Sequence, residues 1–329
     1  MALNLLHTVK SRLLNIHRPG SRPDVFLFAT PRSGSTFLME ILSAQAGMKI
    51  VNEPLQIGQP HIAKSLGWSS WEDAGRTADR KGVFQAHFDR IRCNDLPLVN
   101  RPPYRRGGRF LTDRITFKIL HGGEDLAPWF EEAFGGLILA LTRHPIPTAY
   151  SHVSYPRLPF YLEQPGVAET FTDDERAVIA AAIESGDHLR MGVADWCVQN
   201  KFFTPKYWRP NWTRVSYEAL TLAPRETVES LYEPLHLQPV ADIEALAKRP
   251  SRSTRFSSDE TKSHFSNSEE ADPSFLVERW TAKTGADDIA FTQAALDAFG
   301  VTDYRADDPY PVGFSTARAE RAAPVGAST

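Results

Sequence analysis

Apolar and polar positions alternate in blocks along most of the chain. Short apolar runs predict β-strands at residues 25–28, 48–51, 115–120, 137–141 and 212–216. Apolar positions at helical spacing predict helices from 37, over 126–134, from 148, over 174–203, from 224 and over 287–299. The run at 137–141 is almost continuously apolar, which is typical of a strand buried on both faces of a parallel sheet. Strands that alternate with helices predict an α/β fold with a central parallel sheet flanked by helices.

Other segments depart from this alternation and suggest the domain boundaries. Residues 1–23 are basic, have apolar positions at helical spacing and predict an N-terminal helical segment. Residues 24–314 predict a single domain, and 315–329 predict a disordered tail because they have no apolar periodicity. Within the domain, residues 55–112 are expected to be irregular, apart from a helical or strand-like GVFQAHF, and 250–270 to form a polar, flexible loop.

Composition narrows the class of protein. An apolar content of 42% and a charged content of 23% are ordinary for a soluble globular chain, and a net charge of −3 argues against a nucleic-acid partner. Cys93 and Cys197 fit neither a zinc motif nor a disulfide framework, and we expect reduced, partly buried thiols.

No apolar run reaches the roughly 18–20 residues that span a bilayer, and the N-terminus lacks the features of a signal peptide. We therefore expect a cytoplasmic protein without a transmembrane segment. For residues 1–17 the sequence leaves two alternatives: a short helix packed on the domain, or a weak contact with a membrane surface.

Residues 26–38, FLFATPRSGSTFL, have the layout of a phosphate-binding loop between a strand and a helix. The lysine of the nucleotide-triphosphate loop GxxxxGK[ST] is missing, because Ser35 follows Gly34, and Ala29 replaces the first glycine. The cation of this loop is Arg32. Helix N-termini and loop hydroxyls donate hydrogen bonds to anions. The loop therefore predicts a site for an anion neutralised by arginine.

A second arginine follows the buried strand. In RHPIPTAYS, Arg143 stands at the strand end, and Ser151 lies eight residues later in the next helix. These side chains predict a second phosphate site beside the loop; the alternative is a surface ion-pair arginine and an ordinary helix serine. Triphosphate sites use Mg²⁺ held by an acidic residue at a neighbouring strand end, and this strand ends in Thr142-Arg143.

Four pieces of the sequence, in the family's order, resemble the sulfotransferases that use 3′-phosphoadenosine-5′-phosphosulfate (PAPS). TPRSGSTF is similar to their 5′-phosphosulfate loop and LTRHPIPTAYS to their 3′-phosphate segment. RVSYEALTLAPRETVESLYEPLHL resembles a later strand–helix unit, and RPSRSTRFSSDETKS takes the place of a basic region that closes over the nucleotide. The resemblance covers residues 24–300, is nearest to the carbohydrate-type and bacterial trehalose-type enzymes, and implies a P-loop-like three-layer fold.

The resemblance implies that PAPS is the donor, that 3′-phosphoadenosine-5′-phosphate (PAP) is the product, and that no metal is needed. Arg32 would also stabilise the charge that develops on the leaving phosphate. A P-loop kinase or NTP hydrolase, or a non-catalytic nucleotide-binding protein, are the alternatives. The cofactor-binding residues that the resemblance implies are Pro31, Arg32, Ser33, Gly34, Ser35, Thr36, Phe37, Arg143, Ser151, Tyr217, Arg252, Ser253 and Thr254.

Sulfuryl transfer to an alcohol needs a base near the acceptor hydroxyl. Glu53, in VNEPL, is the preferred base, because carbohydrate-type and trehalose-type enzymes have a glutamate in a similar place; the alternative is a structural cap or ion pair. His121, in FKILH, resembles the histidine of the cytosolic phenol and steroid enzymes, but lies one residue further from its lysine than in that family. His87 is a third candidate, which either touches substrate or lies in the core.

We expect the acceptor pocket within residues 55–115. Trp68 and Trp71 would stack on a sugar or other ring, or pack in the core. Four arginines of this region would favour an anionic acceptor or the phosphates of the donor, or would form a solvated loop: Arg101, Arg105, Arg106 and Arg109. The acceptor expected is a hydroxyl of a carbohydrate, a glycolipid or a small natural product, and the sequence leaves its identity and the oligomeric state open. The substrate contacts predicted are Glu53, Trp68, Trp71 and His87.

Overall fold

The computed structural model describes residues 16–20, 22–96, 111–120, 122–151, 158–163, 165–241, 243 and 272–314. Its strands are β1 (Ile16–His17), β2 (Val25–Ala29), β3 (Met48–Asn52), β4 (Leu111–Thr112), β5 (Arg114–Ile119), β6 (Leu137–Thr142) and β7 (Thr213–Ser216). Its helices up to β6 are α2 (Ser35–Leu42), α3 (Pro60–Leu66), α4 (Glu72–Arg76), α5 (Arg80–Arg92), η1 (Glu124–Leu126) and α6 (Ala127–Phe134). The later helices are α7 (Pro145–Ser151), α8 (Phe160–Glu163), α9 (Pro165–Ala168), α10 (Asp173–Ser185), α11 (His188–Asn200), η2 (Lys201–Phe203), α12 (Tyr217–Leu222), α13 (Pro224–Glu229), α16 (Ser274–Glu278), η4 (Thr281–Lys283) and α17 (Ala286–Ala298).

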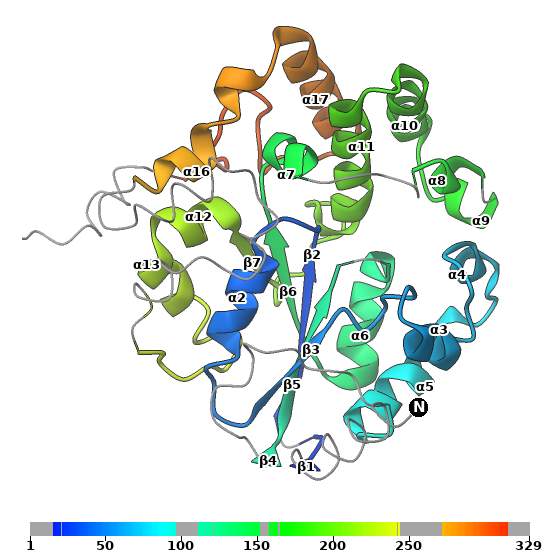
Figure 1. Ribbon diagram of the computed structural model, residues 1–329, viewed down its shortest axis with the longest axis vertical. Coiled ribbons are helices and arrows are strands. Elements are labelled where there is room, and N and C mark those ends of the chain that lie inside the picture. Colours follow the sequence, from blue (N-terminus) through cyan, green and yellow to red (C-terminus); the bar gives the residue numbers. More distant parts are fainter. Residues whose placement is uncertain are drawn as a thin grey trace, which may run out of the picture.

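Five parallel strands form the central sheet in the order β3-β5-β2-β6-β7 (Figure 1). β2 lies in the middle, with Phe26 opposite Phe117 of β5 and Ile138 of β6. All five strands lie within one residue of the predicted apolar runs, and the α/β fold class is confirmed. The helices that follow β2 and β5 cover opposite faces of the sheet. The carboxyl ends of these neighbouring strands therefore form a topological switch point, where α/β proteins bind ligands.

One face of the sheet packs against α3, α5 and α6 through aromatic side chains. Phe26 and Phe28 of β2 lie on this face and contact Phe130 of α6, with ring centroids 4.9 and 5.8 Å apart. Phe88 of α5 packs on the same ring at 5.0 Å. Each of these rings is almost fully buried, which stabilises the fold by about 1.5–3 kcal/mol per side chain. The central strand is thereby fixed against its helices.

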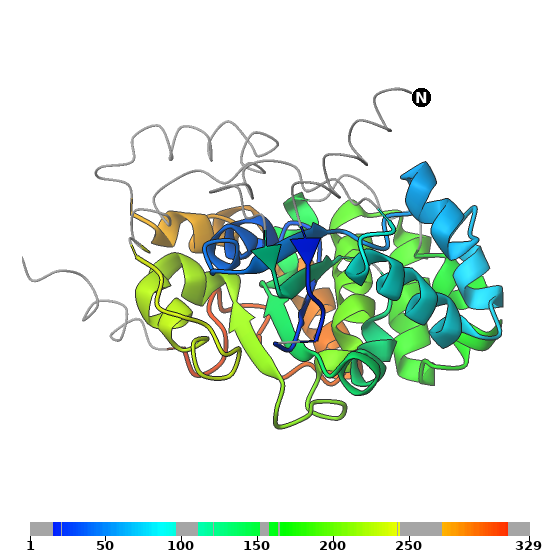
Figure 2. The ribbon, with the colours of Figure 1, turned by 90° about the horizontal axis from the view of Figure 1, so that it is seen from below.

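The other face carries aliphatic side chains, because successive residues of a strand point to opposite faces. Val25 and Leu27 of β2 pack with Leu38 and Leu42 of α2 and with Leu220 of α12. In Figure 2, viewed from below, the yellow-green helices α12 and α13 lie on one side of the strands and the cyan helix α5 lies on the other. The sheet is thus the middle of three layers, and α2 is held against the strand that precedes it.

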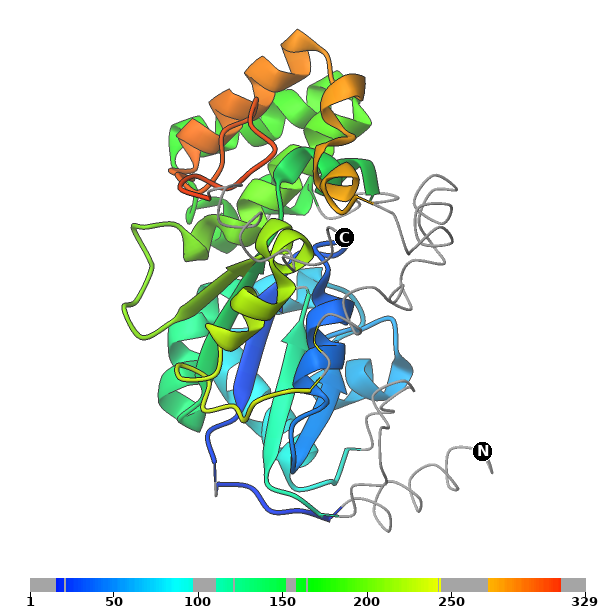
Figure 3. The same cartoon turned by 90° about the vertical axis from the view of Figure 1, so that its left-hand side faces the viewer.

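A third cluster of helices lies beyond the end of the sheet at which β2 and β6 finish (Figures 1 and 3). It joins α7, α10, α11 and α17 through a separate apolar core. The helix predicted over 174–203 is divided here, because Gly186 adopts a left-handed φ of 61° and ends α10, and Asp187 caps α11 by accepting the N–H of Arg190. The cluster covers the carboxyl edge of the strands.

Three sequence expectations need correction. Residues 55–112 are not irregular, because α3, α4 and α5 occupy residues 60–92, and GVFQAHF lies within α5. The N-terminal segment is not helical at Ile16–His17, which form β1 and pair in parallel with β4. Both cysteines are free thiols, as expected, but Cys93 is exposed whereas Cys197 is buried. The expected tail and the loop at 250–270 lie outside the described residues.

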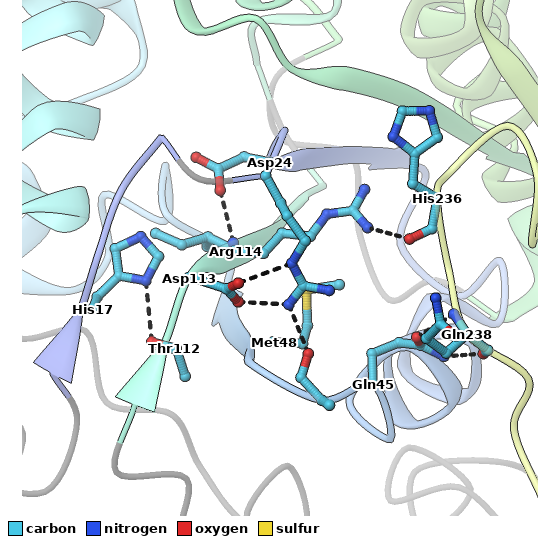
Figure 4. A network of polar contacts seen from close by, with 12 residues as sticks. His17, Asp24, Gln45, Met48, Thr112, Asp113, Arg114, His236 and Gln238 are labelled. Carbon is cyan, nitrogen blue, oxygen red and sulfur yellow. Dashed lines mark hydrogen bonds and ion pairs between the residues drawn. The ribbon is translucent and has the colours of Figure 1, made fainter.

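Polar contacts hold the amino-terminal ends of the strands (Figure 4). Asp24 accepts the backbone N–H of Ile115 at 2.7 Å, and Arg22 donates to both carboxylate oxygens of Asp113. The buried guanidinium of Arg114 donates to the carbonyl oxygen of His236 at 3.2 Å. This end of the sheet is therefore occupied by its own ion pairs and hydrogen bonds. Within the residues described, no helix is both long and apolar enough to cross a membrane.

Candidate active site

The segment between β2 and α2 forms a tight loop that presents the first turn of the helix. The hydroxyl and the N–H of Ser33 both donate to the carbonyl oxygen of Thr30, at 2.6 and 3.3 Å. Gly34 precedes the helix with φ 87°, and its carbonyl accepts the N–H groups of Phe37 and Leu38. The first N–H groups of a helix lack a carbonyl partner within it. They favour a bound anion, together with the positive end of the helix dipole.

Arg32 is held in a strained conformation within this loop. Its φ is 70°, in the left-handed region that non-glycine residues seldom adopt. Burial lowers the pKa of its guanidinium, and the charge of Arg143 lowers it further, against an opposing effect of Tyr217. The repulsion between two partly buried cations is relieved when an anion binds between them. Residues with a strained backbone of this kind occur frequently at functional sites.

Arg143 approaches the loop from the neighbouring strand end. Its side chain is buried, and Nη1 donates to the carbonyl oxygen of Arg32 at 2.8 Å. The guanidinium also lies over the ring of Tyr217, 4.2 Å from the centroid. The same ring packs against Gly34 so closely that a Cβ atom there would lie 2.5 Å from the ring carbon Cδ2. Gly34, Tyr217 and the two arginines therefore form one packed unit.

The remaining predicted residues of the loop differ in what their side chains contact. Ser35 is buried at the start of α2, and Phe37 packs against the aliphatic core rather than into the loop. Pro31 and Thr36 are half-buried. Ser151 ends α7, and its hydroxyl donates to the carbonyl oxygen of Pro147 at 2.7 Å, within its own helix. The Ser151 hydroxyl is thus bonded to the backbone of its own helix.

Glu53 stands beside the loop, directly after β3. Its N–H donates to the carbonyl oxygen of Lys118 at 2.9 Å and extends the pairing of β3 with β5. Its φ of 52° turns the chain out of the sheet at this point. The Glu53 carboxylate lies 3.5 Å from Lys118 Nζ, which is also 3.5 Å from Thr36 Oγ1 on α2. A carboxylate, a lysine and a hydroxyl of the phosphate-binding loop therefore adjoin one another.

Lys118 is a site residue that the sequence reasoning missed. It lies on β5, and its side chain is only 5% exposed. Burial lowers the pKa of its ammonium, and the carboxylate of Glu53 opposes that shift. A lysine within the apolar strand ITFKIL was the available signal, because a charge in a buried strand requires a partner. The contact with Thr36 places Lys118 beside the phosphate-binding loop, which lacks the lysine of nucleotide-triphosphate loops.

Two of the predicted substrate contacts are core residues. His87 lies on α5 with no exposed surface, and its ring nitrogens bond Ser65 Oγ and the carbonyl oxygen of Pro54, both at 2.8 Å. Burial lowers the pKa of its imidazole to about 4. Trp68 is 4% exposed and donates through Nε1 to Thr77. Both side chains are buried and hydrogen-bonded in the core, so the core alternative replaces the predicted substrate contact for each.

Trp71 is half-buried and therefore more exposed than Trp68. Its ring packs on Gly122, just after β5, where a Cβ atom would lie 2.7 Å from the ring. A cleft of about 300 Å³ is lined by residues of α4, which follows Trp71 in the sequence, by the start of α5 and by Leu126 of η1. The expected region for the acceptor thus contains a cleft.

Several sequence predictions lie outside the described residues and stay predictions. They are His121, Arg252, Ser253 and Thr254, together with the loop arginines Arg101, Arg105, Arg106 and Arg109. Over the ranges that the structure describes, no three histidine, cysteine, aspartate or glutamate side chains gather as they do around a metal ion.

No protein-family model and no curated protein sequence matches the chain. Among solved structures, the sulfotransferase domain of the curacin biosynthetic pathway has 14% identity and a TM-score of 0.45, over 84% of this chain and 96% of that one. The sulfotransferase domain of the Synechococcus PCC 7002 olefin synthase has 17% identity and a TM-score of 0.41, over 84% and 94%. Mouse sulfotransferase SULT7A1, complexed with PAP, has 15% identity and a TM-score of 0.36, over 70% and 65%.

All three similar structures are of sulfotransferases or sulfotransferase domains. With TM-scores below 0.5, the likeness carries no weight for the chemistry of this chain, which is argued from its own side chains.

Proposed function

We propose that this protein is a sulfotransferase that moves a sulfuryl group from PAPS to a hydroxyl group of an acceptor. The observation that carries the proposal is the meeting of two arginines from adjacent strand ends at the start of α2. Arg143 Nη1 lies 2.8 Å from the carbonyl oxygen of Arg32, within a loop whose helix offers N–H donors. A pair of guanidinium groups suits a ligand with two phosphate groups close together.

The two arginines have different tasks in this proposal. Arg32 belongs to the loop that holds the 5′-phosphosulfate, so it faces the phosphate oxygen on which negative charge develops. Arg143, stacked on Tyr217, holds the 3′-phosphate, whose charge does not change during transfer. Such a contact contributes to donor affinity and selects PAPS over nucleotides that lack a 3′-phosphate.

Glu53 is the proposed general base. In the transfer step its carboxylate takes the proton of the acceptor hydroxyl, and the acceptor oxygen forms a bond to sulfur. The bond between sulfur and the 5′-phosphate oxygen breaks, and its electron pair stays on the PAP phosphate. Lys118, 3.5 Å from both Glu53 Oε1 and Thr36 Oγ1, pairs with the carboxylate and adds positive charge beside the leaving phosphate.

The acceptor proposed is a hydroxyl compound: a carbohydrate, a glycolipid or a small natural product. The part of the acceptor region that the structure describes offers a cleft whose wall carries Asp79, Arg80 and Lys81. A metabolite extract incubated with enzyme and PAPS should yield products heavier by one sulfonate in mass spectrometry.

The decisive test compares Glu53→Gln with Glu229→Gln. Glu229 is half-exposed and pairs with Arg225 on α13, so its amide variant controls for the loss of a carboxylate. Glu53→Gln should lower the transfer rate by about 10²–10⁴-fold, while calorimetry shows PAP binding unchanged. Transfer by Glu53→Gln at the parental rate, with His121→Gln inactive, would assign the base to His121 instead.

Calorimetry separates the donor proposed from a nucleoside triphosphate. PAP should bind the parent protein with higher affinity than ATP with Mg²⁺. If ATP with Mg²⁺ binds and PAP does not, the protein is not a PAPS-dependent enzyme. If PAP binds but no acceptor is ever sulfated, the protein binds nucleotide without catalysis.

A further inference from the structure

The residues on either side of Arg143 are held by a buried polar network that the transfer chemistry does not use. Thr142 Oγ1 lies 3.2 Å from the hydroxyl of Tyr304, near the C-terminal end of the described chain. The N–H of His144 donates to Glu218 Oε1 at 2.9 Å, and the hydroxyl of Tyr304 donates to Glu218 Oε2 at 2.9 Å. We refer to Thr142, His144, Glu218 and Tyr304 as the Arg143 bracket.

The Arg143 bracket is buried throughout. Tyr304 is 2% exposed and Glu218 is 1% exposed. Burial raises the pKa of Glu218, whereas the His144 N–H and the charge of Arg143 lower it. A buried carboxyl group is unfavourable unless it is well hydrogen-bonded, and here each oxygen accepts one bond from the bracket. The Glu218 carboxyl group therefore links the backbone N–H of His144 to the hydroxyl of Tyr304.

The side chain of His144 adds a further tie to the same C-terminal segment. Its Nε2 donates to the carbonyl oxygen of Arg305 at 3.0 Å, and its ring stacks on Trp280 with centroids 4.3 Å apart. Residues 304–305 thus hold both neighbours of Arg143, one through a hydroxyl and one through a carbonyl. The backbone that carries Arg143 is fixed from outside its own strand.

We propose that Glu218 and Tyr304 are positioning residues for donor binding. They fix the end of β6 so that the Arg143 guanidinium keeps its place between the Arg32 carbonyl and the Tyr217 ring. This inference rests on the proposed function, because it assigns the bracket to the arginine that holds the 3′-phosphate. Since that phosphate keeps its charge during transfer, loss of the bracket acts on donor affinity and leaves the turnover rate unchanged.

The direct test is Tyr304→Phe, which removes one hydroxyl and keeps the ring. It leaves Glu218 Oε2 and Thr142 Oγ1 without the bonds they share with Tyr304. Because the lost bonds free the strand end that carries Arg143, PAP affinity should fall about tenfold, or about 1.4 kcal/mol. Tyr232→Phe is the matched control: the Tyr232 hydroxyl accepts the N–H of Val240 at 2.9 Å, away from the loop. PAP affinity should stay at the parental value in that control.

A double-variant cycle distinguishes positioning from general destabilisation. In an Arg143→Ala background, Tyr304→Phe should cause no further loss of PAP affinity, because its effect acts through the missing guanidinium. The same tenfold loss in both backgrounds would overturn the inference, as would unchanged affinity in Tyr304→Phe alone. If Tyr304→Phe does not fold, Thr142→Val carries the test, with a loss of about threefold expected from the smaller change.

Kinetics and a conservative variant complete the comparison. Tyr304→Phe should raise the KM for PAPS about tenfold with kcat unchanged; a fall in kcat at constant KM would overturn the positioning role. Glu218→Gln can still accept from His144 and donate to Tyr304, so its PAP affinity should lie between those of the parent and Tyr304→Phe. If the parent protein binds no PAP, the proposed function fails. If the parent binds PAP and Arg143→Ala weakens it while Tyr304→Phe does not, only this inference fails.

Discussion

Gly34→Ala tests whether the loop, Tyr217 and Arg143 act as one packed unit. The substitution adds one methyl group at a residue with φ 87°. That methyl carbon would lie 2.5 Å from Cδ2 and 3.1 Å from Cε2 of the Tyr217 ring, well inside van der Waals contact. The ring has to move, and it carries the Arg143 guanidinium on its face, 4.2 Å from the centroid.

The expected cost has two separable parts. A non-glycine residue in the left-handed region costs about 1–2 kcal/mol, which appears as lost folding stability. Displacing the Tyr217 ring removes a cation–π contact of about 0.5–2 kcal/mol for a partly buried pair and releases the Arg143 guanidinium. A disturbed 3′-phosphate contact of about 1.4 kcal/mol corresponds to a tenfold loss of affinity. We therefore expect PAP affinity to fall at least about tenfold.

Gly186→Ala is the matched control. Gly186 also has a positive φ, of 61°, but a Cβ atom there would meet nothing within 4 Å, and it lies at the end of α10. Urea unfolding should show a stability loss of about 1–2 kcal/mol in Gly186→Ala and a larger loss in Gly34→Ala, which also loses the ring contact. Isothermal calorimetry should show weakened PAP binding in Gly34→Ala alone.

Two outcomes would show that the loop and the Tyr217 ring are not coupled. If both alanine variants bind PAP as the parent does, the loop and ring are not coupled. The second test uses Tyr217→Ala, which removes the ring that the new methyl group would strike. Adding Gly34→Ala to Tyr217→Ala should then change PAP affinity little, since the clash is gone. If Gly34→Ala lowers PAP affinity by the same factor with and without the Tyr217 ring, then Gly34 affects nucleotide binding independently of that ring.

Further predictions follow from the same site and core. Arg32→Ala should lower kcat by more than about 10²-fold, whereas Arg143→Ala should raise the KM for PAPS and abolish the preference for a 3′-phosphate in calorimetry. Transfer after EDTA treatment should keep its full rate, because arginines and backbone donors neutralise the phosphates; a loss restored by Mg²⁺ would refute this. Burial lowers the pKa of His87 to about 4 and of His144 to about 3, below the unfolded value of 6.5. Stability present above pH 6.5 is therefore lost as pH falls, by about 2 kcal/mol per histidine at pH 5. Urea unfolding at pH 7.5 and 5 should show this loss reduced in His87→Gln and unchanged in the control His188→Gln, whose histidine is exposed.

The strands of the sheet and the phosphate-binding loop could be predicted because their signals are local. Five apolar runs separated by helical patterns specify a parallel sheet whatever their partners are. The loop at 30–36 can be recognised because a turn, a glycine and hydroxyl residues lie between a strand and a helix. The helix α5 had a signal as well, since Phe84, Phe88 and Ile91 share one face, but its glycine and short neighbours obscured it.

The contacts that complete the site could not be predicted, because they join residues far apart in the chain. Lys118 meets Thr36 across 82 positions, and Tyr304 meets Glu218 across 86. A sequence shows that a buried lysine or glutamate needs a partner, but only the folded chain supplies it. For His87 the sequence suggested a catalytic or substrate contact that the fold does not provide. Its two ring nitrogens are instead bonded to the carbonyl oxygen of Pro54 and the hydroxyl of Ser65.

The backbone supports the roles proposed for Arg32 and Glu53 without reference to their charges. Each has a positive φ, of 70° and 52°, in a region where a side chain is strained. Such strain persists only where surrounding contacts overdetermine it, and those contacts are present: the Arg32 carbonyl accepts from Arg143, and the Glu53 N–H donates to Lys118. Arg143 directly follows β6 and holds the Arg32 carbonyl with its guanidinium, whereas Lys118 lies on β5 and accepts the Glu53 N–H with its backbone carbonyl oxygen. The side chain of Lys118 then lies 3.5 Å from the Glu53 carboxylate. The two residues that hold the strained backbone are thus the same two that bring positive charge to Arg32 and to Glu53.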